Sequence, residues 1–461
     1  MILDVRNGML SFILKACTIS CLSEKEKYMV KYEEYSRKAD CFIPAGAHTY
    51  IRTDEVFPGN APKVIERSKG VYTWDVDGNE YIDYGMACRS VTVGYDYDRI
   101  SNAAIRQIHN GNTATKASKV EVEAAELMCS LFPWVDMVKF AKNGSTVTSA
   151  AVKLARAYTG RKYVARCREH SFFSYDDWFI GDTVMDAGIP EEVKALTLQF
   201  SFNDINSVRN LFEEYKGRIA ALIMEPCDSE EPEDDFLQEV GKLCREYGVV
   251  YILDEMITGF RWDLQGACKY YGVEPDLVTF GKGMANGFSV AALGGRREIM
   301  DLGGLTPGRE RVFLISTTHG AEMGSLGALI ETIHVYEELN LTDHIWKMGK
   351  RIVSGLREIA EEYSLQDYFY IEGAECSPNF VVCGKDGKAS FMHRTVFCQE
   401  MIKAGILMPY IAIAYEHTEK EIDRTLEAAR KSIKVYGESL NGDVEQFIEG
   451  NVIKPVFRKY N

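Results

Sequence analysis

The chain has 461 residues and a formal net charge of −15, with 46% hydrophobic and 26% charged residues. This length supports a large core and one or two domains, and the composition is that of an ordinary globular protein. So negative a charge argues against nucleic acid or an anionic membrane as partner, because either binds to a basic surface. The 12 cysteines form no CxxC pair or metal-ligand cluster. We therefore expect free thiols in a reducing cytoplasm, and no metal site.

Residues 1–30 are predicted to form an N-terminal extension. Residues 9–14 are apolar, but Lys15 interrupts the run, and no stretch reaches the roughly 20 residues that cross a membrane. We therefore expect no membrane partner, with a signal peptide ending near Cys21 as the alternative. The charge-rich segment 23–40 predicts a surface helix.

The stretch 137–156 predicts a strand, a tight turn and a long helix that stops at Gly160. Gly144, Ser145 and Thr146 fall in the first turn of that helix. Unpaired backbone N–H groups and the helix dipole make such a turn a site for phosphate, and the hydroxyls add donors. An ordinary helix cap uses the same residue types, so the residues alone leave both interpretations open.

Two buried strands are predicted on either side of an amphipathic helix. Residues 221–225 are apolar up to Glu225, residues 236–247 show helical spacing, and residues 249–254 are apolar up to Asp254. A strand, a helix and a second strand in this order predict a βαβ unit of a mostly parallel sheet.

A lysine follows the next apolar run. Residues 277–280 have strand character, and Gly281 and Lys282 come directly after them. An acid and a lysine at the ends of two buried strands fit a pyridoxal 5'-phosphate (PLP) site, where Lys282 would form a Schiff base and Asp254 would keep the pyridine nitrogen protonated. Gly281 and Gly283, on either side of Lys282, would leave room for a flat ligand. A solvated surface lysine is the alternative.

Three longer stretches, residues 70–84, 253–261 and 279–287, resemble the class III (subgroup II) PLP-dependent aminotransferases, in the branch that contains glutamate-1-semialdehyde aminomutase. The resemblance is collinear from about Ile43 to about Ala429. It implies an α/β, aspartate-aminotransferase-like fold (fold type I). The expected division is a large PLP-binding domain of mostly parallel sheet, residues 86–325, and a smaller α+β domain built from residues 31–85 and 326–461.

The resemblance also indicates which residues bind the cofactor phosphate and what oligomer the protein forms. Gly144 and Ser145 match the phosphate turn, although the family usually has Ser-Gly-Thr-Glu where this chain has Asn-Gly-Ser-Thr. Thr318 matches a threonine that reaches across a dimer interface to the partner's cofactor phosphate. We therefore expect a homodimer with shared active sites.

The resemblance also assigns residues around the ring and the substrate. Arg52 matches a substrate-contacting arginine, and the alternative is an exposed arginine. Phe172 is predicted to stack on the pyridine face, and a one-residue shift of the match would assign Phe173 instead. Glu225 matches a strand-end glutamate near the cofactor.

The predicted function is transfer of an amino group from an amino acid donor to a carbonyl acceptor, with an amino sugar, amino alcohol or nucleotide-linked compound as the product class. The alternative is a 2,1-aminomutase of the glutamate-1-semialdehyde type, and a remote alternative is a PLP-binding protein without turnover. The acidic segment 227–235 replaces a glycine-rich loop of the aminomutases and would disfavour acidic substrates. This departure favours the aminotransferase.

Overall fold

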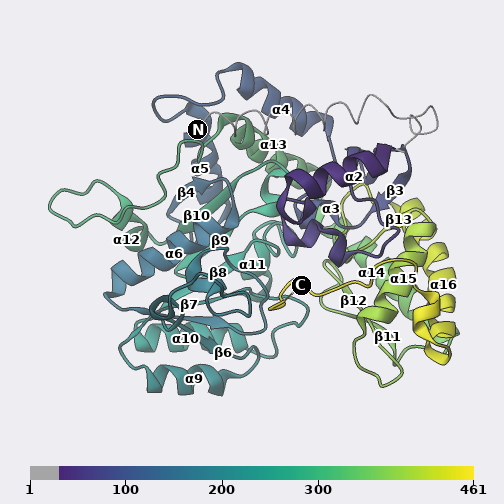
Figure 1. Cartoon of the computed structure of the whole chain (residues 1–461). Coiled ribbons are helices and arrows are strands. Elements are labelled where there is room, and N and C mark those ends of the chain that lie inside the picture. The colour runs from purple at the N-terminus through teal and green to yellow at the C-terminus, as the bar shows by residue number, and fades with distance from the viewer. Residues whose placement is uncertain (1–30, 461) are drawn as a thin grey trace, which may run out of the picture.

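The computed structural model describes residues 31–460, so the predicted extension, 1–30, lies outside the described residues. Helices surround three sheets (Figure 1). The strands are β1 (Ile65–Lys69), β2 (Tyr72–Asp75), β3 (Glu80–Asp83), β4 (Met137–Ala141), β5 (Tyr163–Cys167), β6 (Thr197–Phe200), β7 (Ile219–Met224), β8 (Val250–Glu255), β9 (Leu277–Phe280), β10 (Ala291–Gly295), β11 (Phe369–Glu372), β12 (Asn379–Val382) and β13 (Ile406–Leu407).

The helices vary from single turns to long rods. They are α2 (Lys31–Phe42), α3 (Met86–Arg89), α4 (Asp98–His109), α5 (Lys119–Leu131), α6 (Gly144–Thr159), α7 (Asp177–Ile180), α8 (Glu191–Lys194), α9 (Ile205–Glu214), α10 (Phe236–Tyr247), α11 (Gly266–Tyr271), α12 (Arg297–Met300), α13 (Met323–Leu339), α14 (Leu341–Glu362), α15 (Phe391–Lys403) and α16 (Glu419–Asn441). The predicted surface helix 23–40 is described from Lys31 onward, as α2.

The largest sheet has seven strands in the order β4-β10-β9-β8-β7-β5-β6. Neighbouring strands from β9 to β6 run parallel, and β10 is antiparallel to both β9 and β4. The predicted βαβ unit is β7, α10 and β8. Because parallel strands carry their carboxyl ends to one edge, the loops after β7, β8 and β9 meet there.

Alternation along these strands sends side chains to two apolar layers. Ile223 of β7 and Ile252 of β8 pack on one face, in a cluster with residues of α6. Leu222 and Leu253 point to the other face, in a cluster with residues of α9 and α10. Burial of both faces explains why these strands are almost continuously apolar.

The second sheet joins distant parts of the chain. Its strand order is β1-β2-β3-β13, and β13 pairs in parallel with β3, with Ile406 opposite Ile82. A separate antiparallel pair, β11 and β12, lies beside it. The sheet therefore needs both ends of the described chain, and the expected domain bounds at residues 86 and 325 stay a prediction.

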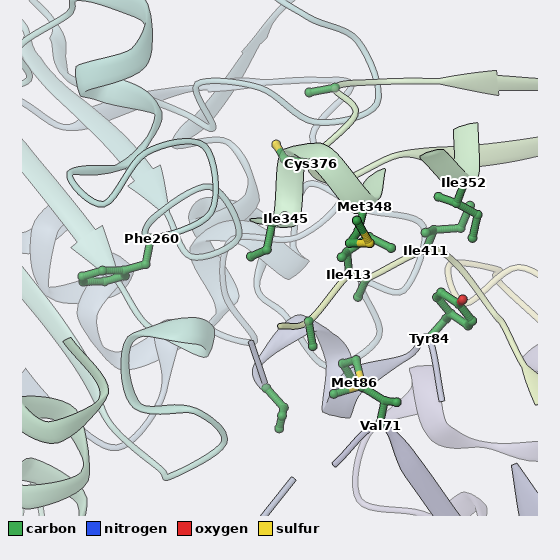
Figure 2. Packing of buried hydrophobic residues seen from close by; sticks show 14 of the residues in the cluster. Val71, Tyr84, Met86, Phe260, Ile345, Met348, Ile352, Cys376, Ile411 and Ile413 are labelled. Carbon is green, nitrogen blue, oxygen red and sulfur yellow. The ribbon is translucent and has the colours of Figure 1, made fainter. Parts of the chain in front are cut away.

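One hydrophobic cluster connects the two regions (Figure 2). It contains Phe260, which follows β8, together with Tyr84 and Met86, which follow β3. Ile345 and Met348 of α14 belong to the same cluster. The large sheet and the region built from the two ends of the chain thus share a core.

Within residues 31–460, no helix is both long enough and apolar enough to cross a membrane. The same residues hold no group of three or more His, Cys, Asp or Glu side chains placed to bind a metal ion.

Candidate active site

Three neighbouring parallel strands have an ionisable residue at or just after their carboxyl ends. Glu225 follows β7, Asp254 lies near the end of β8, and Lys282 follows β9. The register places Asp254 opposite Thr279 of β9, so the aspartate and the lysine lie on adjacent strand ends. Glu225 and Asp254 are both buried. The structure therefore brings together the acid and the lysine that the sequence pattern paired.

Asp254 is held by two donors. Its Oδ1 accepts hydrogen bonds from the Met256 backbone N–H and from Thr279 Oγ1, each at 3.0 Å. Burial raises the pKa of Asp254 to about 6, and the positive charge of Lys282 acts against that rise. A protonated pyridine nitrogen beside this carboxylate would supply a second compensating charge.

The turn that carries Lys282 is fixed by the loop after α3. Lys282 begins a short 3-10 helix, Lys282–Ala285, and Asn286 ends it in the left-handed conformation. Asn286 Oδ1 accepts the backbone N–H groups of Thr92 and Val93 at 3.0 Å each. These bonds hold the backbone from which the lysine side chain projects.

Gly281 makes room for a side chain of the protein itself. A Cβ at this position would lie 2.6 Å from Met256 Sδ, and one at Gly144 would lie 2.9 Å from the same atom. The glycine beside Lys282 was expected to admit a flat ligand. In the structure, the two glycines let Met256 pack between the loop before Lys282 and the start of α6.

The start of α6 has the features of an anion site. Asn143 Oδ1 accepts the Thr146 backbone N–H at 3.0 Å and so caps the helix. Ser145 Oγ accepts the Tyr175 backbone N–H at 3.1 Å. Within residues 31–460, the backbone N–H groups of Gly144 and Ser145 have no acceptor. Asn143 performs the capping that the sequence left to Ser or Thr, so the cap leaves two N–H groups unpaired, as the predicted phosphate site requires.

Glu225 is buried with one oxygen unsatisfied. Its Oε2 has no hydrogen-bond partner, and burial raises the pKa of its carboxyl well above the ordinary value. Its backbone N–H donates to His170 Nδ1 at 3.0 Å. Burial lowers the pKa of His170 to about 3, which keeps the imidazole neutral and able to accept this bond. His170 thus fixes the backbone at the end of β7.

The two candidate phenylalanines have different surroundings. Phe173 is buried, and its ring meets Phe179 edge-on at 5.7 Å between ring centroids. Phe172 is 49% exposed. The Phe172 ring also meets Phe179 edge-on, at the same 5.7 Å, so the two differ in exposure; an exposed ring keeps a face available for a flat ligand, as the predicted role of Phe172 requires.

The remaining predicted residues lie at the surface of the single chain. Arg52 is exposed at the end of a 3-10 helix, Tyr50–Arg52, where its charge acts on buried Asp83. Thr318 is exposed in the segment between α12 and α13. Neither is placed against the three strand ends by a hydrogen bond or ion pair among the described residues.

Two charged residues near the strand ends were missed or misassigned. The charges of both Arg89 and Lys282 act on Asp228. The sequence placed Asp228 in an acidic segment, 227–235, that was expected to disfavour acidic substrates, and it did not single this residue out; the structure partly buries it. Arg89 was not singled out. Nothing in its sequence neighbourhood, residues 85–90, signals the backbone conformation that places it here.

The chemistry of these residues matches the groups of PLP. Asp254 is a buried carboxylate that a pyridinium would neutralise, and Gly144 and Ser145 offer two unpaired N–H groups to a phosphate. Lys282 lies at the adjacent strand end, and Phe172 offers a ring face. The residues present are thus of the kinds that the ring, the phosphate and the aldehyde of the cofactor require.

Comparison with known proteins supports this fit. The model of the Aminotransferase class-III family matches residues 56–409. A glutamate-1-semialdehyde 2,1-aminomutase from Archaeoglobus fulgidus is 33% identical over 416 residues, covering 85% of this chain and 96% of that protein. A 3-aminobutyryl-CoA aminotransferase from Cloacimonas acidaminovorans is 31% identical over 407 residues, covering 86% and 95%. The FumI protein of Sphingopyxis sp. MTA144, solved in its PLP internal aldimine form, has a TM-score of 0.80 at 26% identity, covering 90% of this chain and 99% of that one.

The predictions of fold type I, of PLP as the cofactor and of an enzyme of this family near the aminomutase branch are therefore confirmed. The match covers most of the chain and includes all three active strand ends. The chain belongs to the class-III aminotransferase family.

Proposed function

We propose that the protein transfers an amino group from an amino acid to a separate carbonyl acceptor, in the cytoplasm. An amino sugar, an amino alcohol or a nucleotide-linked amine is the class of product. The family relation supports amine chemistry at PLP, and its named relatives include both an aminomutase and an aminotransferase. The choice between these outcomes depends on whether the deaminated donor leaves the site.

The residues of the chain have distinct tasks in this reaction. PLP, when bound, supplies an aldehyde that takes up the amine and a ring that accepts electrons. Lys282 carries the attachment point on Nζ and, once displaced by the donor's amine, moves the proton at the donor's α-carbon. Asp254 holds the proton on the pyridine nitrogen through its buried carboxylate. Gly144 and Ser145 bind the phosphate, and Phe172 orients the ring.

The acidic loop between β7 and α10 favours a transferase over a mutase. The loop between β7 and α10 contains five exposed acids, which are Glu230, Glu231, Glu233, Asp234 and Asp235. It also contains Asp228, on which the charge of Lys282 acts. A negatively charged loop near the reacting lysine would repel an anionic 2-oxo acid, so it favours release of the deaminated donor. A mutase must retain that compound until the amine returns.

A half-reaction tests this proposal. Holoenzyme given L-alanine or L-glutamate alone should release one equivalent of 2-oxo acid per site. Addition of a carbonyl acceptor should then carry ¹⁵N from the labelled donor to the acceptor, and Lys282→Ala should do neither. Release of no oxo acid from common amino acids, with isomerisation of a semialdehyde that keeps its nitrogen, would establish the mutase instead.

We also propose a homodimer with shared active sites. Thr318 is exposed in the single chain, on a segment that extends from the body after α12 (Figure 1). The same segment exposes Leu305 and Phe313, at 78% and 75%. Large apolar side chains this exposed are typical of a protein interface. An exposed threonine beside them is available to a partner's cofactor phosphate.

Complementation tests the shared site. Thr318→Ala alone should weaken retention of PLP, and Lys282→Ala alone should be inactive. Mixed subunits of the two variants would contain one site with both changes and one with neither, so mixing should recover activity. A fully active monomer in dilute solution would contradict the proposal.

A further inference from the structure

Arg89 stands at the end of a turn with an unusual backbone. The four residues of α3, Met86, Ala87, Cys88 and Arg89, have φ values of 40°, 47°, 62° and 63°. Left-handed conformation costs a non-glycine residue roughly 1–2 kcal/mol, and such strain gathers at functional sites. The buried Asp83 carboxylate holds the turn, since its Oδ1 accepts the backbone N–H groups of Gly85 at 2.7 Å and of Met86 at 3.2 Å.

The turn places the Arg89 guanidinium on an aromatic ring. Its Cζ lies 4.2 Å from the centroid of the Tyr410 ring. The Tyr410 hydroxyl in turn donates to the Gly85 carbonyl oxygen at 3.1 Å, at the start of the same turn. A guanidinium bound by its face keeps its N–H edges available for a planar acceptor.

Among residues 31–460, those N–H edges have no acceptor. Arg89 Nε is buried without a hydrogen-bond partner. Within residues 31–460, the Arg89 side chain makes no hydrogen bond and no ion pair within 4.0 Å. A cation held by its face, with every edge unpaired, has the geometry of a receptor for carboxylate.

A second arginine, Arg261, lies close enough to Arg89 for their charges to interact. Arg261 is fully buried, its Nη2 has no partner, and Nη1 reaches only the backbone oxygens of Ile413 at 2.9 Å and Cys376 at 3.4 Å. Burial lowers the pKa of Arg261 to about 10, and the charge of Arg89 adds to the lowering. Two guanidinium groups therefore act on each other here, and among the described residues neither has a carboxylate within ion-pair distance.

Arg89 lies close to the turn that carries the reacting lysine. It ends α3, which packs against the 3-10 helix that begins with Lys282. The charges of Arg89 and Lys282 also act on the same two carboxyl groups, those of Glu225 and Asp228. A substrate whose amine reaches Lys282 can direct a carboxylate toward Arg89.

We propose that Arg89, stacked on Tyr410, binds the carboxylate of the amino donor through its unpaired guanidinium edge. This assignment rests on the proposed function, because it concerns the donor of that reaction. Arg52 was the residue expected for this role. Arg52 is exposed and has no aromatic support, whereas Arg89 is fixed in place before the donor arrives, which lowers the entropic cost of binding.

Binding of a non-reactive carboxylate tests the assignment without turnover. Isothermal titration calorimetry of the PLP-loaded enzyme compares propionate with its neutral isostere propionamide, at constant ionic strength. The native enzyme should prefer propionate, and Arg89→Gln should weaken propionate binding by about 10- to 100-fold while leaving propionamide unchanged. Arg89→Lys should fall between the two, because it keeps the charge and loses the planar fork.

Matched variants and a folding control complete the test. Arg99→Gln removes one positive charge from a surface ion pair with Glu331 and Glu338, so it should leave the preference for propionate intact. Thermal unfolding and PLP absorbance of each variant show that the fold and the loading persist. The assignment is overturned if Arg52→Gln, and not Arg89→Gln, removes the preference, or if the native enzyme shows none. Transfer of ¹⁵N by an enzyme with either binding result leaves the proposed function standing.

Discussion

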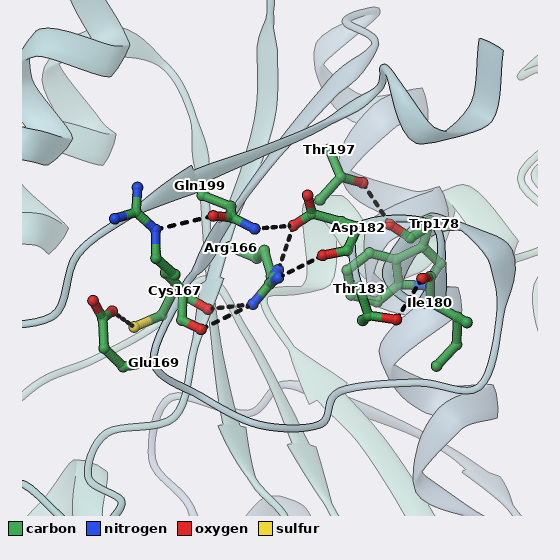
Figure 3. Close-up of polar contacts among 10 residues, drawn as sticks. Arg166, Cys167, Glu169, Trp178, Ile180, Asp182, Thr183, Thr197 and Gln199 are labelled. Atoms are coloured by element: carbon green, nitrogen blue, oxygen red, sulfur yellow. Dashed lines mark hydrogen bonds and ion pairs between the residues drawn. The ribbon is translucent and has the colours of Figure 1, made fainter. Parts of the chain in front are cut away.

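Arg166, which is buried, and Arg89, which is partly buried, differ in the hydrogen-bond partners of their guanidinium groups. Arg166 lies on β5, and all three of its nitrogens are used (Figure 3). Its Nε donates to Asp182 Oδ2 at 2.6 Å and its Nη2 to the Asp182 carbonyl oxygen at 3.0 Å. Its Nη1 donates to the carbonyl oxygens of Cys167 at 3.0 Å and Arg168 at 3.2 Å. This cation is neutralised within the fold.

Both guanidinium groups lie over an aromatic ring, Arg166 over Phe179 and Arg89 over Tyr410, but Arg89 Nε has no hydrogen-bond partner. Arg166 lies within a regular strand, whereas Arg89 ends a left-handed turn. Arg166 therefore has a structural role, whereas Arg89 has the unpaired donors that we propose bind the donor's carboxylate. A protein that leaves a guanidinium unpaired on a strained turn loses stability in the empty state, and binding of an anion offsets that loss.

The first prediction compares how much each of the two arginines contributes to stability. Arg166→Gln removes the cation that pairs with the Asp182 carboxylate and the donor to the carbonyl oxygens of Cys167, Arg168 and Asp182, and should lower the free energy of unfolding by about 3–5 kcal/mol. Arg89→Gln breaks no hydrogen bond or ion pair, so its change should stay within about 1 kcal/mol. Urea unfolding of the apoprotein measures both. An equal loss in the two variants would show that Arg89 is structural as well.

The second prediction concerns Asp254, a buried carboxylate whose charge, like that of Arg89, is not fully compensated within the described residues. Asp254 has a folded-state pKa near 6 against 3.8 for the ordinary group, because it is buried. The folded apoprotein therefore binds more protons than the unfolded chain between these values, and its stability falls as pH rises through about 4 to 6. Asp254→Asn should remove that fall and stabilise the apoprotein at pH 7 by about 1–3 kcal/mol.

The same variant should lower amine transfer by about a hundredfold, because an amide cannot hold the pyridinium charge. Urea unfolding across pH and the rate of the half-reaction test the two effects separately. A less stable variant with a nearly unchanged rate would identify Asp254 as a structural residue.

The smallest effect is expected at Asp228, the acid that Arg89 does not pair with. Its negative charge near Lys282 should disfavour a second carboxylate on the donor. Asp228→Asn should raise kcat/KM for L-glutamate relative to L-alanine by about three- to tenfold. The L-alanine rate serves as the internal control. An unchanged ratio would place Asp228 away from the donor's side chain.

The sequence was sufficient for the parts of the site that follow regular structure. Apolar runs ending in Asp254 and Lys282 predict buried parallel strands, and parallel strands necessarily bring their carboxyl ends together. The helix start at Gly144 was likewise predictable from its residues. Family resemblance was needed to identify the cofactor, since an acid and a lysine alone also fit a solvated pair.

Other features depend on tertiary contacts that leave no local pattern. The pairing of β13 with β3 joins two short segments from opposite ends of the chain. The turn at Met86–Arg89 uses four non-glycine residues in a conformation that sequence rules assign to glycine or asparagine. Arg89 was therefore missed, and Met256 packing between two glycines could not be foreseen from either glycine.

We expect the cofactor to be attached at the end of β9, beside the buried acid of β8, and its point of attachment can be measured directly. Borohydride reduction of the PLP-loaded enzyme, followed by protease digestion and mass spectrometry, locates the attached pyridoxyl group. The account predicts a single labelled peptide, with the label on Lys282 and none in Lys282→Ala. A label on another lysine of the native enzyme would contradict the site described here.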